Sequence, residues 1–140
     1  MKATNKIQAL LLVILLANLI STGIHYWDNY VNFVRYPLPG WITQPGVYLA
    51  WFGLLPFGIL GYWLYSRCKW WLAYGCLGLY ALTGTTTLGH YFYAPIDHFS
   101  TQMNISMLSD GLVGYSLIAF IIWSALVRRE WQSTLDSNNL

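Results

Sequence analysis

The sequence predicts an all-α bundle of four transmembrane helices, with the N and C termini both cytoplasmic. Three observations lead to this prediction. The 140-residue chain is 56% hydrophobic and only 9% charged, whereas a soluble domain carries about 25% charged residues. Its apolar residues gather in four runs, each near the roughly 20 residues that a helix needs to cross a bilayer. Its basic residues are distributed very unevenly between the two sides of these runs.

The four helices are expected at about residues 7–28, 46–66, 70–93 and 103–128. Helices are expected because lipid offers no partner for unpaired backbone groups. Pro37 and Pro39 separate the first two runs, since proline lacks an N–H and restrains the residue before it. Ser66-Arg-Cys-Lys69 forms a tight turn, and Ala94-Pro-Ile-Asp97 opens the last connection. Residues 1–131 therefore form one transmembrane domain, followed by a polar C-terminal tail at 132–140.

The charges predict the orientation and exclude some classes of protein. Six of the seven basic residues fall on one side of the membrane if the chain crosses four times; they are Lys2, Lys6, Arg67, Lys69, Arg128 and Arg129. Only Arg35 lies on the other side. This asymmetry is typical of the positive-inside rule. A net charge of +2 is too small to indicate a nucleic-acid partner. The expected partner is the lipid bilayer, and the chain is predicted to be a multi-pass integral membrane protein.

Ionisable residues from three helices are expected at one depth near the outer edge of the hydrocarbon. Counted from the inner charges at 1.5 Å per residue, His25 lies at roughly 28 Å, His90 at roughly 32 Å and Asp110 at about 27 Å. Asp28 follows His25 by one turn on a polar stripe of the first helix. Polar stripes in lipid face protein or a water-filled cavity. The sequence therefore predicts a polar pocket at the outer end of the bundle.

We expect this pocket to bind a lipid-like or aromatic small molecule. Asp110 is the candidate proton acceptor or charge, and His90 is expected to orient it; these are also the two candidate catalytic residues, although no reaction can be named. Asp28 and His25 would form the opposite wall. Aromatic side chains commonly line such pockets, and the two assigned to its walls are Trp27 and Trp51.

The order of these parts resembles the emopamil-binding family of four-helix membrane proteins, which includes the sigma-2 receptor and sterol isomerase. The shared features are Asp28 at the outer end of the first helix, Tyr36-Pro-Leu-Pro-Gly-Trp41, Leu55-Pro56-Phe57 and Cys68-Lys-Trp70. The resemblance implies that Asp28 contacts an amine or a sterol-like ligand. The family's acid on the second helix has no counterpart, because residues 47–65 contain no Asp or Glu.

Three alternatives stay open at this stage. His25, Asp28, His90 and Asp110 have side chains that suit a divalent metal ion, and two histidines on separate helices also suit a haem. The chain is also compatible with an accessory subunit of a membrane complex, or with a homo-oligomer, held by its glycine-rich helix faces. Finally, the polar residues are compatible with a structural role, in which the histidines cap helix ends and Asp28 pairs with Arg35.

Overall fold

The computed structural model describes residues 5–132 and contains four helices and no strand within that range. They are α1 (Asn5–Val31), α2 (Gln44–Ser66), α3 (Trp70–Thr85) and α4 (Thr101–Ile122). Each helix packs on the next, and α4 packs back on α1. The predicted all-α bundle is confirmed. Lys2 and all but the first residue of the predicted tail at 132–140 lie outside the described residues.

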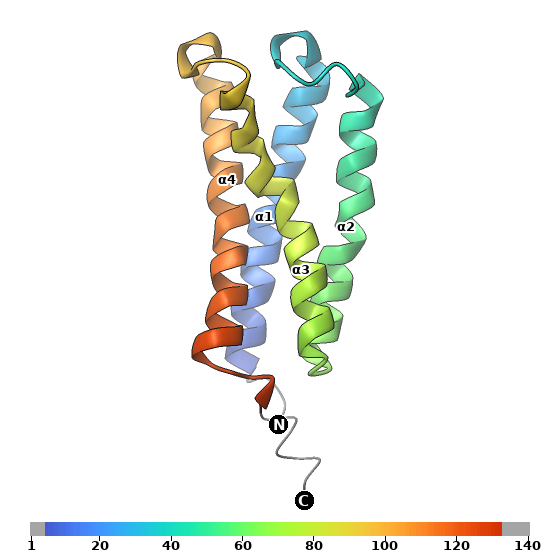
Figure 1. Ribbon diagram of the computed structural model, residues 1–140, viewed down its shortest axis with the longest axis vertical. Helices are drawn as coiled ribbons and strands as arrows, with labels where there is room; N and C mark the ends of the chain where they lie inside the picture. The colour runs from blue at the N-terminus through green and yellow to red at the C-terminus, as the bar shows by residue number, and fades with distance from the viewer. Residues whose placement is uncertain (1–4, 133–140) are drawn as a thin grey trace, which may run out of the picture.

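The two ends of the bundle differ in charge. The start of α1, the α2–α3 turn and the C-terminal end of α4 lie together (Figure 1) and carry Lys6, Arg67, Lys69, Arg128 and Arg129. We call this the basic end. The connections at residues 32–43 and 93–100 lie at the opposite end, which we call the loop end.

Three helices are long and apolar enough to cross a membrane. They are α1, α2, and α4 together with its π-helical extension η4 (Trp123–Val127). Large apolar side chains point outward from them; Ile20, Ile59 and Leu112 are 63%, 74% and 70% exposed. A soluble helix keeps its outer face polar. These surfaces therefore indicate a membrane protein.

The predicted single helix at residues 70–93 is wrong in its second half. The α-helix ends at Thr85, and the chain continues as the 3₁₀ helix η2 (Thr86–Phe92). Thr85 and Thr86 donate side-chain hydrogen bonds to the carbonyls of Ala81 and Leu82, and Thr87 donates to an earlier carbonyl in the same way. Such bonds compete with regular helical pairing. At 16 residues, about 24 Å, α3 alone is shorter than the hydrocarbon.

The other helix boundaries follow from their caps. The Thr43 side chain accepts a hydrogen bond from the backbone N–H of Gly46 at 3.2 Å, and α2 begins at Gln44, directly after Thr43. The Ser100 side chain accepts from the N–H of Met103 at 3.2 Å in the same way before α4. Both caps satisfy a donor that the first helical turn leaves unpaired.

Candidate functional site

Near the loop end α3 packs closely on α4, and a space lies on the opposite side of the chain, toward α1 and α2. A Cβ placed on Gly84 would lie 2.5 Å from the backbone oxygen of Asp110 and 3.0 Å from the Cα of Gly114. Only glycine permits the backbones to approach this closely. Above this contact, Leu88 of η2 packs against Gly111 of α4. The chain therefore leans toward α4 as it rises (Figure 1).

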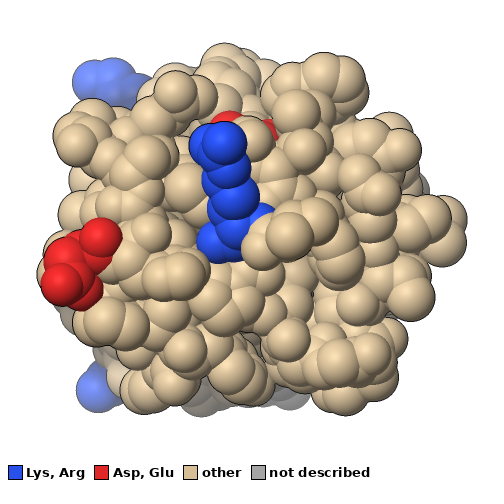
Figure 2. Space-filling view, turned by 90° about the horizontal axis from the view of Figure 1, so that it is seen from above, with Lys and Arg blue, Asp and Glu red and all other residues tan. Residues whose placement is uncertain are grey.

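A cavity of about 430 Å³ lies between α1, α2 and η2 at the loop end. Residues of the α1–α2 connection, from Leu38 to Thr43, form part of its wall. The volume is within the range of small-molecule sites, about 300–1,000 Å³. Seen from the loop end, the surface is almost free of charged side chains, with only small separate patches of each sign (Figure 2).

Four polar side chains that line the cavity are more than nine-tenths buried: His25, Asn29, Thr87 and His90. Asn29 Nδ2 donates to His90 Nε2 at 3.3 Å, so the proton of a neutral His90 ring is on Nδ1. His90 Nδ1 lies near the Pro37 carbonyl but makes no hydrogen bond of normal geometry, and Asn29 Oδ1 also has no partner. Both atoms are themselves buried, so the pair presents neither a free donor nor a free acceptor to the cavity.

His25 contributes the second imidazole of the cavity. Its Nδ1 lies 3.0 Å from the Ser106 hydroxyl of α4, which leaves Nε2 for a molecule in the cavity. The rings of His25 and His90 are in T-shaped contact, with centroids 5.6 Å apart. The prediction that these two histidines lie together is confirmed. Rings packed directly on one another leave no layer between them for a haem plane.

Aromatic and apolar side chains form most of the remaining wall. They include Tyr26 of α1, Trp41 of the α1–α2 connection and Tyr93 beyond η2. No Asp, Glu, Lys or Arg is among the lining residues. The cavity therefore favours a neutral, largely apolar molecule with a few hydrogen-bonding groups.

Asp28 lies behind the cavity rather than in its lining. Its carboxylate accepts hydrogen bonds from Asn32 Nδ2 at 2.9 Å and from the Tyr36 hydroxyl at 2.5 Å. The expected alternative pairing with Arg35 is absent from the described contacts of Asp28. The Tyr36 ring packs on His25 and His90, with centroids 5.8 and 5.0 Å away. Burial and the bond to Asp28 raise the pKa of Tyr36, which keeps its phenol protonated.

Asp110 is fully buried and is not among the lining residues either. Neither of its carboxyl oxygens makes a hydrogen bond of normal geometry, although Ser21 of α1 lies beside it. The predicted contact in which His90 orients Asp110 is therefore absent from the described hydrogen bonds of Asp110. Burying a carboxyl is costly unless it is hydrogen-bonded, and Asp110 lies where the backbone of α4 closely approaches Gly84 of α3.

The two predicted tryptophan walls do not line the cavity. Trp27 is 59% exposed and stacks near Tyr30 on the outer face of α1. Trp51 of α2 lies just below the cavity, where its Nε1 donates to the Thr22 hydroxyl at 2.9 Å. Its ring covers Gly23, where a Cβ would lie 3.4 Å from the indole.

The structure gives no support to the metal alternative. Between residues 5 and 132, no group of three or more His, Cys, Asp or Glu side chains is arranged to hold a metal ion. Asp28 is held by Tyr36, and Asp110 is buried apart from the two imidazoles. The predicted four-residue set of His25, Asp28, His90 and Asp110 is thus divided among three environments.

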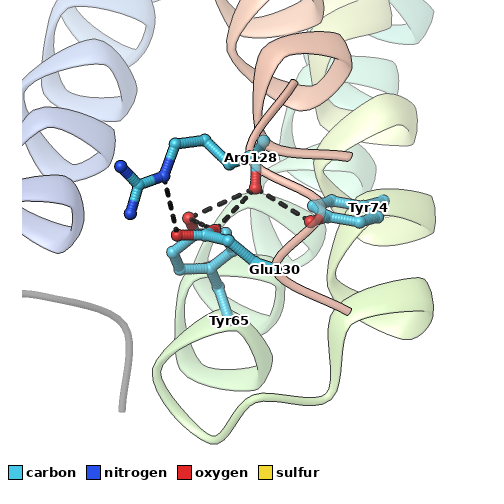
Figure 3. Close-up of polar contacts among 5 residues, drawn as sticks. Tyr65, Tyr74, Arg128 and Glu130 are labelled. Atoms are coloured by element: carbon cyan, nitrogen blue, oxygen red, sulfur yellow. Dashed lines mark hydrogen bonds and ion pairs between the residues drawn. The ribbon is translucent and has the colours of Figure 1, made fainter. Parts of the chain in front are cut away.

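A second buried polar cluster lies at the basic end and was not predicted. Tyr65 and Ser124 donate to Glu130 Oε2, Ser124 at 2.8 Å, and Tyr74 lies 2.8 Å from the Ser124 hydroxyl. Figure 3 shows Tyr65 and Arg128 at the Glu130 carboxylate, with Arg128 Nε 3.8 Å from Oε1, and Tyr74 on the far side of the Ser124 hydroxyl. The available sequence signals were a serine within an apolar run and an acid beside two arginines.

Comparison with protein-family models, curated proteins and solved structures found no match. The resemblance to the emopamil-binding family stays a prediction.

Proposed function

We propose that this chain is a multi-pass integral membrane protein that binds a neutral, mostly apolar small molecule in the cavity at its loop end. The observation that carries the proposal is the lining itself. Two imidazoles and an amide lie in a wall that is otherwise mostly apolar and aromatic, and no described hydrogen bond uses His25 Nε2. Buried polar atoms normally have partners, and a ligand that supplies them gains affinity.

The positions of the carboxylates argue against a basic amine as the ligand. Asp28 is already occupied by Tyr36 and Asn32, and Asp110 does not line the cavity. A cation placed there would lose its hydration without gaining a direct ion pair. The proposed ligand is therefore neutral, and no reaction is assigned to the site.

We also propose that the chain crosses the membrane four times, with the basic end in the cytoplasm. Five of the described basic residues gather at that end, and only Arg35 lies at the loop end. α3 and η2 together extend about as far as the other helices, since η2 adds about 14 Å to α3. The cavity would then open near the outer surface.

The binding proposal can be tested with naphthol, a neutral aromatic alcohol, and naphthylmethylammonium, a cation of similar size. We expect naphthol to raise the melting temperature of the purified protein and the cation to leave it unchanged. The variants His25→Phe and His25→Leu should lose most of this response, because both remove Nε2. His98→Phe is the matched control, because His98 lies in the loop-end connection and does not line the cavity. An equal naphthol response in all four proteins would refute the site.

A further inference from the structure

Two helices end at the basic end in turns of the same kind. Cys68, after α2, and Arg129, after η4, are the two non-glycine residues with positive φ between residues 5 and 132, at 58° and 50°. In both turns the residue that follows donates its backbone N–H to a carbonyl of the preceding helix. A left-handed residue in this position ends a helix. The basic residues of the two turns are all exposed: Arg67, Lys69, Arg128 and Arg129.

Side-chain contacts hold the two turns together. The Tyr65 hydroxyl, at the end of α2, donates to the Glu130 carboxylate of the second turn (Figure 3). Trp71, at the start of α3, contacts Trp131, with ring centroids 5.6 Å apart. Lys69 and Arg129 each precede one of these tryptophans by two residues. The four basic side chains therefore belong to one surface, which we call the basic platform.

The basic platform has little negative charge of its own. Glu130 is the one acid at this end within residues 5–132, and its buried carboxylate accepts hydrogen bonds from Tyr65 and Ser124. Arg128 lies 3.8 Å from that carboxylate, and the other three platform residues make no ion pair within the same range. Positive charges gathered on one surface favour an anionic partner.

Tryptophan and aliphatic side chains border the platform. The guanidinium carbon of Arg67 lies 5.5 Å from the ring centroid of Trp63, and the second turn holds an arginine–tryptophan pair of the same kind. Trp71 and Leu126 are 66% and 68% exposed. Tryptophan favours the level of the lipid headgroups, and an exposed leucine suits contact with an acyl chain. This combination fits an amphiphile with a negative headgroup.

We propose that the basic platform binds the headgroup of an anionic phospholipid. Its arginines can hold the phosphate through paired N–H bonds, and its lysine binds as a point charge. The acyl chains then lie against the exposed apolar side chains next to the two turns. The platform and the cavity are at opposite ends of the bundle, so this inference does not depend on the proposed function.

The test is native mass spectrometry of the full chain from detergent micelles that contain equal amounts of phosphatidylglycerol and phosphatidylcholine with the same acyl chains. We expect the wild type to retain one phosphatidylglycerol in preference to phosphatidylcholine. Lys69→Gln and Arg129→Gln, one from each turn, should each lower this preference about tenfold, because each removes a charge-assisted bond to phosphate. Lys6→Gln is the matched control, because it removes the same charge from the basic end but from neither turn. It should change the preference by less than about twofold, since a charge that does not touch the phosphate is screened.

Four outcomes would overturn the proposal. Equal retention of the two lipids would show that the platform does not select negative charge. An equal loss in Lys6→Gln and the turn variants would indicate a diffuse positive field, and a loss in only one turn variant would show that the turns do not form one site. Displacement of the lipid by glycerol phosphate at the same concentration would identify a soluble phosphate ligand. None of these results affects the cavity, which is tested separately with naphthol.

Discussion

Tyr36 connects the cavity to the nearest carboxylate. Its ring packs on both imidazoles, while its hydroxyl donates to Asp28 from outside the membrane-spanning helices. Tyr36→Phe should lower the free energy of unfolding by about 1.5–3 kcal/mol at neutral pH, the range for hydrogen bonds to charged groups. Denaturant titration in detergent micelles measures it. Tyr115→Phe, at an exposed tyrosine of α4, should change it by less than about 0.5 kcal/mol.

The hydrogen bond between Tyr36 and Asp28 also predicts that the free energy of unfolding depends on pH in the alkaline range. The folded-state pKa of Tyr36 is raised above the unfolded value of about 10. The contribution of Tyr36 is therefore fully present below that pH and is lost as the pH rises toward the folded-state pKa. The difference in unfolding free energy between wild type and Tyr36→Phe should narrow above about pH 10. A difference that stays constant would show that Tyr36 ionises equally in both states.

Ser124 is the residue on which the polar cluster at the basic end depends. Its hydroxyl bonds to Glu130 and lies within hydrogen-bonding distance of Tyr65 and Tyr74. Ser124→Ala leaves those buried oxygens short of a partner, so it should lower the unfolding free energy by about 1–3 kcal/mol. Ser116→Ala is the control, since Ser116 is exposed on α4 and its described hydrogen bond goes to the Leu112 carbonyl one turn earlier. Equal values for the two variants would contradict a role for this cluster in stability.

The sequence placed the two histidines correctly but not the two acids. Depth along a helix follows from residue counting, so His25 and His90 were found at one level. Which side of a helix faces the cavity depends on how the helices lean, and this is set by the contact of Gly84 with Gly114. Asp110 lies in the contact between α3 and α4 and does not line the cavity. Asp28 was one helical turn from His25, as counted, but its bond to Tyr36 of the following loop could not be read from spacing.

At the scale of elements, the α3–α4 crossing can be tested with two glycines of the same helix. Gly84→Ala inserts a Cβ against backbone of α4, so it should lower the unfolding free energy by about 1–3 kcal/mol. A Cβ at Gly75 meets nothing within 4 Å, so Gly75→Ala should raise it by about 0.5–1 kcal/mol through helix propensity. The two changes are chemically identical and opposite in expected sign. A matching sign would mean that the crossing is not tightly packed.

The starts of α2 and α4 were predicted to within two residues, whereas the end of α3 was missed because side chains compete there for the backbone. Thr43 and Ser100 precede α2 and α4 as ordinary N-caps. By contrast, the apolar run at residues 70–93 contains consecutive threonines whose hydroxyls bond to earlier carbonyls. Hydropathy does not detect this competition. The resulting 3₁₀ segment η2 carries His90 into the cavity wall, so the missed irregularity is what positions the site.

At the scale of the whole molecule, the proposed orientation determines from which side a ligand reaches the cavity. Single cysteines at Asp97, in the loop-end connection, and at Lys69, in the basic-end turn, would lie on opposite sides of the membrane if α3 and η2 complete a fourth crossing. In a background with Cys68 and Cys76 replaced by serine and alanine, a membrane-impermeant maleimide should label Asp97→Cys in intact cells. Lys69→Cys should react only after permeabilisation, because the positive-inside rule places that turn in the cytoplasm. Labelling of both from one side would mean that α3 and η2 do not span the bilayer.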